Sequence, residues 1–169
     1  MIQIYDKNTI KPTTNGKMVL LPNSCKLQAT LNGSWILNMN HPTDSEGRWK
    51  YIEEESILSV PTFVGKGQLF RVNKLTKKDY SIDVVAYPIF FDAAKEVFLE
   101  DVRPTIKNGQ EALDIMTSGT NFEGKSNIST SSTAYFERRN LLDAISGSDE
   151  PTFLQRWGGE IIYDNYCGC

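Results

Sequence analysis

One stretch of the sequence decides the fold of the first half of the chain: Lys26-Leu27-Gln28-Ala29-Thr30-Leu31-Asn32-Gly33-Ser34-Trp35-Ile36-Leu37-Asn38-Met39-Asn40. Apolar residues occupy every second position of Leu27–Leu31, before Asn32-Gly33, and of Trp35–Met39, after it. Two such runs around Asn-Gly strongly indicate a β-hairpin, because this dipeptide readily adopts the left-handed conformations of a tight turn. We expect the hairpin to end at His41-Pro42, since proline cannot donate to a strand ladder.

Further strand-like segments surround this hairpin. Asn15-Gly16 and Lys77-Lys78-Asp79 provide turn signals between them. The region 1–90 is therefore predicted to be a mostly antiparallel β meander or small barrel, because strand edges need closure or cover. The alternating or extended segments are Ile2–Ile4, Lys17–Leu21, Trp49–Val60, Phe70–Asn73 and Tyr80–Ala86.

From Phe90 onward the pattern changes to short helices. Phe91–Phe98 is interpreted as a short helix or an irregular crossover. Asn108 is expected to cap a helix containing Ala112, Leu113 and Met116, with Gly119 just beyond its end. The segment Gly124–Thr133 is rich in Ser, Thr and Asn, which is typical of a loop or an exposed strand.

The last third of the chain carries two more helix signals. Asn140 is expected to begin a helix that ends near Gly147. Ser148 or Asp149 is expected to cap the next helix, with Pro151 in its first turn. A returning strand is predicted over Glu160–Tyr166. The fold class is therefore α+β, with a β-rich domain at 1–90 and a helix-containing lobe at 91–169.

The composition excludes several classes of protein. With 40% apolar and 23% charged residues, the chain is neither disordered nor fibrous. No apolar run approaches the roughly 18 residues of a membrane helix, so no membrane insertion is expected. The net charge of −3 and the lack of a basic cluster argue against a nucleic-acid partner. Met1–Asp6 lacks the basic and apolar regions of a signal peptide, so synthesis in the cytoplasm is expected.

No catalytic, cofactor-binding or metal-binding residue is assigned from the sequence. His41 is the single histidine, and its position beside Pro42 favours a structural role over a catalytic triad. Cys25 lies far along the chain from Cys167 and Cys169, and two thiolates without further ligands make half a zinc site. We interpret the three cysteines as free thiols.

Other chemically suggestive residues have simpler interpretations. Glu53-Glu54-Glu55 is interpreted as a solvated strand edge, because consecutive strand positions point to opposite faces. Gly65-Lys66-Gly67 and Gly158-Gly159 lack the frame of a phosphate-binding loop. The candidates for a subunit interface are Trp35, Trp49 and Trp157. Trp35 and Trp49 are also candidates for stacking on sugars, although strand aromatics more often pack inward.

Several short segments, in matching order along nearly the whole chain, resemble one known family. Together they resemble the N-terminal region of phage minor structural proteins, also called the prophage tail endopeptidase family, of Gram-positive siphophages and prophages. The segments are Gly47–Ile52, Ala86–Phe90, Asp101–Thr105 with Asn108-Gly109, Asn140–Leu142, Arg156–Glu160 and Asp164–Tyr166.

This resemblance implies a fold and a role. The fold would be similar to that of the baseplate hub proteins of tailed phages, which assemble as trimers with barrel-like domains in a ring at the tail tip. The chain would then be a scaffold at the virion tail tip, homotrimeric and in contact with other tail and baseplate proteins. In longer family members, the region that follows carries peptidoglycan cleavage or receptor binding. Host attachment and any peptidase activity are thus expected outside this segment, and 91–169 is expected to be the start of a truncated region.

The leading hypothesis from the sequence is a non-enzymatic structural subunit of a phage or prophage tail tip. Two alternatives stay open. One is a fragment of a cell-wall endopeptidase, or tail-associated lysin, which would need a nucleophile or metal constellation. The other is a receptor- or carbohydrate-binding module that uses Trp35, Trp49 or other exposed aromatic residues.

Overall fold

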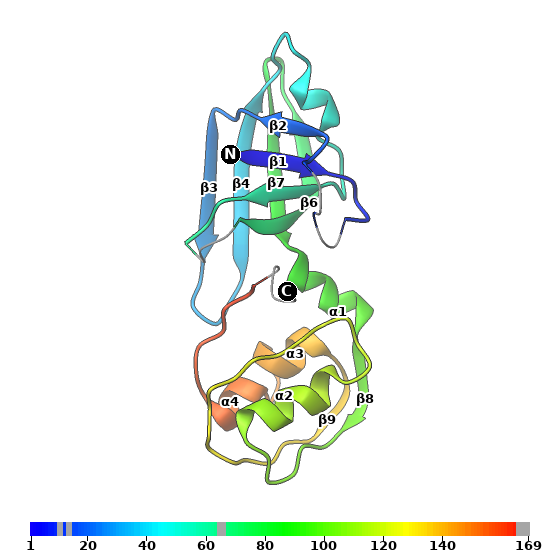
Figure 1. The fold of residues 1–169 in the computed structure, drawn as a ribbon, viewed down its shortest axis with the longest axis vertical. Helices are drawn as coiled ribbons and strands as arrows, with labels where there is room; N and C mark the ends of the chain where they lie inside the picture. The colour runs from blue at the N-terminus through cyan, green and yellow to red at the C-terminus, as the bar shows by residue number, and fades with distance from the viewer. Residues whose placement is uncertain (10–11, 13–14, 64–66, 165–169) are drawn as a thin grey trace. The chain divides into compact units, whose positions relative to one another are not determined.

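The computed structural model describes residues 1–9, 12, 15–63 and 67–164, which form two compact units (Figure 1). The N-terminal unit comprises Met1–Ile89 together with Tyr163 and Asp164. The helical unit comprises Phe90–Ile162. Each unit buries a hydrophobic core of its own.

A seven-stranded antiparallel sheet makes up most of the N-terminal unit (Figure 1). The strand order is β2-β1-β5-β6-β7-β4-β3. The sheet therefore departs from a simple meander, because β4 pairs with β7 and β1 pairs with β5. The strands are β1 (Ile2–Tyr5), β2 (Met18–Leu20), β3 (Ser24–Ala29), β4 (Trp35–Pro42), β5 (Ile57–Val60), β6 (Gln68–Lys77) and β7 (Ser81–Pro88).

The connection between β2 and β3 forces this sheet to curl. These strands lie at opposite ends of the strand order, yet only the segment 21–23 separates them in the chain. Seven strands in a flat sheet would hold the outer two roughly 29 Å apart. Four peptide steps, from Leu20 to Ser24, span at most roughly 15 Å. The sheet is therefore a half-barrel, and Figure 1 shows β1 and β2 running across β4 and β7.

The hairpin predicted around Asn32-Gly33 is confirmed. β3 and β4 pair from Ser24↔Asn40 to Ala29↔Trp35, and Asn32 has a φ of 56° in the turn. Alternate residues of β4 fill the inside of the half-barrel, so Trp35, Leu37 and Met39 are buried. Leu31 is 68% exposed, because it lies in the turn rather than in the strand.

The sequence predicted one of two other turn regions of the N-terminal unit correctly and the other in part. The predicted extended run Trp49–Val60 is wrong for its first part, where η1 (Arg48–Tyr51) is a 3-10 helix and only Ile57–Val60 is a strand. Asp44 causes this turn, because its carboxylate accepts a hydrogen bond from the Arg48 backbone N–H at 2.9 Å. Gly16 precedes β2, as expected, and a Cβ there would lie 2.5 Å from the Ile4 carbonyl oxygen.

The helical unit packs short helices against a two-stranded antiparallel sheet (Figure 1). Trp157 anchors its core, since the indole stacks on Phe153 at 5.0 Å and its Nε1–H donates to the Lys107 carbonyl at 2.8 Å. The strands β8 and β9 lie outside the elements that the sequence predicts. After η2 (Ile89–Asp92), the elements are α1 (Ala93–Glu96), β8 (Phe98–Val102), α2 (Gly109–Thr117), β9 (Phe136–Asn140), α3 (Leu141–Ser146) and α4 (Phe153–Trp157).

The predicted starts of α2 and α3 are confirmed. Asn108 and Asn140 accept hydrogen bonds from the backbone N–H groups of Glu111 and Asp143. The predicted cap of α4 is wrong, because Thr152 caps it and Pro151 precedes it. Thr152 prevails over Ser148 and Asp149 because Gln155, three residues later, completes a capping box with it.

The predicted returning strand is also wrong within the described residues. Glu160–Asp164 forms no strand, and positions 165 and 166 lie outside the described residues. Gly158 and Gly159, with φ of 77° and 98°, turn the chain before this segment. Tyr163 packs edge-on against Trp35 with ring centroids 5.7 Å apart, and the Gln68 side-chain amide donates a hydrogen bond to the Asp164 carboxylate at 3.2 Å. Side-chain contacts therefore hold the end of this segment.

Replacing Asn108 with Ala tests the capping box of α2. We expect Asn108→Ala to lower the free energy of unfolding by about 1 kcal/mol, because the first-turn N–H groups lose their acceptor. Urea unfolding followed by circular dichroism measures the change. Asn127→Ala is the matched control, since Asn127 is exposed in a loop of the same unit and should change stability little. Equal effects of the two substitutions would contradict the capping argument.

Candidate functional site

His41 is part of the fold rather than of a reactive site. Its side chain is completely buried in β4. Its Nε2 accepts a hydrogen bond from the Leu21 backbone N–H at 3.3 Å, and its Nδ1 lies 2.7 Å from the Pro42 carbonyl oxygen. Both contacts are satisfied when Nδ1 carries the proton and the ring is neutral. The imidazole thereby fastens the short β2–β3 connection to β4.

The cysteines offer no reactive arrangement that the structure describes. Cys25 is half-buried in β3, and burial raises the pKa of its thiol, which disfavours the nucleophilic thiolate. Cys167 and Cys169 lie outside the described residues. Across 1–9, 12, 15–63 and 67–164, no group of three or more His, Cys, Asp or Glu side chains is placed to hold a metal ion.

Two of the three tryptophans point into the cores. Trp35 is 4% exposed and lies against Phe63 and Tyr163, with ring centroids 5.1 and 5.7 Å away. Trp157 is 6% exposed. Trp49 is partly buried against the core of the N-terminal unit, with the Lys50 ammonium 5.8 Å from its ring centroid. Trp35 and Trp157 are therefore core residues and present no ring face for a ligand.

The acidic run Glu53–Glu55 is exposed, but it lies in a turn rather than on the predicted strand edge. Glu55 has a φ of 68°, and its backbone N–H donates to the Val72 carbonyl at 2.9 Å. This hydrogen bond joins the chain to β6 two residues before β5 starts. The run thus shapes a turn in which the Glu55 carboxylate lies 3.6 Å from the Arg71 guanidinium, while Glu53 and Glu54 are exposed to solvent.

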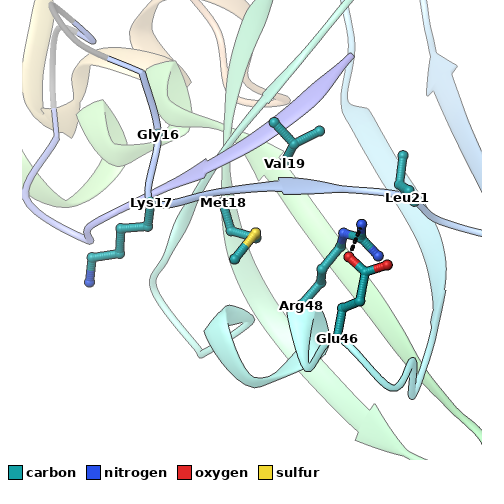
Figure 2. Close-up of a pocket in the computed structure, with 7 residues that line it drawn as sticks. All are labelled: Gly16, Lys17, Met18, Val19, Leu21, Glu46 and Arg48. Carbon is teal, nitrogen blue, oxygen red and sulfur yellow. Dashed lines mark ion pairs between the residues drawn. The ribbon is translucent and has the colours of Figure 1, made fainter.

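A pocket of about 370 Å³ lies beside β2, and we call it the β2 pocket (Figure 2). Its polar wall is Arg48, which donates to Asp44 at 3.0 Å and also pairs with Glu46. Figure 2 shows the Arg48 and Glu46 side chains pointing toward each other. The guanidinium is therefore already occupied by carboxylates of this chain. The lining residues are Gly16, Lys17, Met18, Val19, Leu21, Glu46 and Arg48.

The charge of Asp44 is held by its contacts with Arg48. Desolvation alone would raise the pKa of Asp44, but the hydrogen bonds from the Arg48 side chain and backbone N–H outweigh it. The net effect is a pKa below the ordinary value of 3.8. Asp44 is thus a charged structural residue that fixes Arg48 and begins η1.

A second pocket, of about 440 Å³, lies in the helical unit beside β9, and we call it the β9 pocket. Charged and polar side chains dominate its lining, and Phe98, which is 61% exposed, stands among them. Sequence reasoning missed this site, since its residues come from α1, β8, β9, α3 and the following loop. The lining residues are Ala94, Phe98, Glu137, Arg138, Arg139, Asn140, Asp143, Ser148 and Asp149.

No helix among the described residues combines the length and the hydropathy needed to cross a membrane. No protein-family model matches the sequence, and no curated protein sequence does so either. Among solved structures, the chain is similar to prophage tail protein gp18 from Listeria monocytogenes EGD-e, with a TM-score of 0.67 and 19% sequence identity. The similarity covers 97% of this chain and 48% of that one, so this chain spans about half the length of gp18. At this identity the likeness establishes a shared fold.

Removing the His41 side chain tests its role in fastening the half-barrel. We expect His41→Ala to lower the free energy of unfolding by about 3 kcal/mol, because it leaves a cavity and removes the acceptor for Leu21. Urea unfolding measures the loss. Asn38→Ala is the control, because Asn38 lies on the same strand with an exposed side chain. A His41→Ala protein as stable as the control would contradict the structural role.

The Asp44–Arg48 contact predicts a pH dependence of stability. Because the pKa of Asp44 is lower in the folded state than in the unfolded state, its contribution is complete above the ordinary carboxyl pKa and is lost as pH falls through the folded value. The stability difference between the natural protein and Asp44→Asn should therefore shrink as pH falls from about 5 to about 2. Urea unfolding at each pH measures it. Glu46→Gln is the control, since Glu46 is largely exposed and should show a weaker trend.

Proposed function

We propose that this chain is a structural component of a phage or prophage tail. The likeness in fold to a prophage tail protein, which extends over 97% of the chain, is the observation that carries the proposal. The ordered sequence segments that resemble the phage minor structural proteins and prophage tail endopeptidases support it independently. In this role the chain acts by its shape and its contacts with other tail proteins.

The finer proposal is a scaffold similar to the baseplate hub, at the virion tail tip, that assembles as a homotrimer. An open half-barrel suits this role, because β2 and β3 have a single neighbouring strand each within the described sheet. Open strand edges accept strands or loops from other chains. Leu21 and Leu31, 57% and 68% exposed, flank β3 and add apolar area at this edge. Other tail and baseplate proteins are the further partners in this proposal.

The proposed role is not enzymatic. Any peptidase activity of the resembling family is assigned to regions outside this segment. The opposing result would be release of soluble fragments from purified peptidoglycan by this chain, which would support an endopeptidase instead.

The tail role predicts that the protein is a constituent of phage particles. Particles induced from the host strain and purified by density gradient should contain this chain, and gold-labelled antibodies should bind at one end of the tail in electron micrographs. Antibody against a cytoplasmic protein of the host serves as the control. Intact tails that lack the chain would contradict the proposal.

The oligomer is tested separately from the tail role. Multi-angle light scattering of the natural chain should show a trimer, and Leu21→Asp with Leu31→Asp should convert it to a monomer by placing charge in the interface. Tyr80→Asp, at a side chain that is 85% exposed on the β6–β7 turn, is the matched control and should remain trimeric. A monomeric natural chain would overturn the homotrimer and leave the tail role to the particle experiment.

A further inference from the structure

Arg138 has an unusual backbone conformation for its place in the structure. It lies in the middle of β9 with a φ of 52°, in the left-handed region that non-glycine residues rarely occupy. The register is continuous on both sides of it, with Leu99 opposite Arg139 and Asp101 opposite Glu137. No extra residue is therefore inserted in β9, and the conformation instead breaks the pair that Arg138 would form with Glu100. Strained residues of this kind concentrate at functional sites.

The two neighbouring arginines of β9 differ in what they contact. Arg139 is held against the loop after α3, because its guanidinium donates to the carbonyl oxygens of Asp149 at 3.0 Å and Pro151 at 2.8 Å. The Arg138 side chain is exposed, and no hydrogen bond or ion pair joins its guanidinium to the described residues. The strained backbone thus places a guanidinium with unused donors on the wall of the β9 pocket.

The rest of the pocket supplies acceptors and a ring face. The Asp143 carboxylate accepts a hydrogen bond from the Asn140 amide at 2.6 Å, and Ser148 lies within 3.5 Å of the Asp149 carboxylate. Phe98, at the start of β8, is 61% exposed, although contact between a phenyl ring and water is unfavourable. The volume of about 440 Å³ lies within the range of roughly 300–1,000 Å³ found for small-molecule sites.

We propose that the β9 pocket binds a neutral saccharide. Sugar hydroxyls donate and accept hydrogen bonds, so they can satisfy the Arg138 guanidinium and the carboxylates of Asp143 and Asp149 together. The apolar face of a sugar ring packs on an exposed aromatic ring such as that of Phe98. A phosphate or other anion is disfavoured by the carboxylates of Asp143 and Asp149, and an apolar ligand is disfavoured by the polar lining. The Glu137 carboxylate contributes less, because it is paired with the Arg103 guanidinium at 2.8 Å. This site is independent of the trimer and of the tail role.

The test uses the whole chain and a defined panel of neutral mono- and oligosaccharides of glucose, galactose, rhamnose and N-acetylglucosamine. Saturation-transfer NMR detects binding, and titration calorimetry measures the affinity of the binders. We expect at least one member to bind with a Kd of about 1 mM or below. Phe98→Ala and Arg138→Gly should each weaken it at least tenfold.

Arg138→Gly separates binding from folding. Because glycine adopts positive φ without strain, this variant should melt at the same temperature as the natural protein or a few degrees higher, while its saccharide affinity falls. Tyr80→Ala, at an exposed aromatic residue of the N-terminal unit, is the control and should bind as the natural chain does. Failure of every saccharide to bind up to about 10 mM, or binding that both pocket variants leave unchanged, would overturn the proposal.

Discussion

The N-terminal unit depends on one geometric constraint, the short connection from β2 to β3. Because it joins the two ends of a seven-stranded order, the sheet can form only if it curls. The curl creates an inside, which the alternate residues of β4, β6 and β7 fill. His41 secures this arrangement from within, since its Nε2 accepts the hydrogen bond of the Leu21 N–H on the connection itself. The one residue that invites a catalytic interpretation is thus explained by the architecture.

In the helical unit, local capping residues determine where the helices begin, and contacts of one tryptophan hold the elements together. Side-chain caps begin α2, α3 and α4. These caps fix where each helix starts, but they do not say which helix meets which strand. Trp157 joins distant segments, because its indole stacks on Phe153 and donates a hydrogen bond to the Lys107 carbonyl, fifty positions earlier in the chain. β8 and β9 then pair across the same core.

The arginines of the two pockets differ in whether their guanidinium groups are paired within the protein. In the β2 pocket, the carboxylates of Asp44 and Glu46 pair with the Arg48 guanidinium. These ion pairs stabilise a turn and leave few guanidinium donors for a ligand. In the β9 pocket, Arg139 has that structural task and Arg138 keeps its donors, at the cost of a strained backbone. The proposed scaffold role rests on the shared fold, whereas the proposed saccharide site rests on this local contrast between adjacent arginines.

The sequence by itself determined the features that depend on neighbouring residues: the hairpin around Asn32-Gly33, the caps at Asn108 and Asn140, and the inward alternation of β4. It misplaced the cap of α4, which the capping box of Thr152 and Gln155 decides, and it predicted a returning strand from Glu160 that the described residues do not form. Only the tertiary structure decided the strand order, the burial of His41 and the β9 pocket. These arise from contacts between segments far apart in the chain, and the free energy of such contacts depends on the packing of the whole unit rather than on any local pattern.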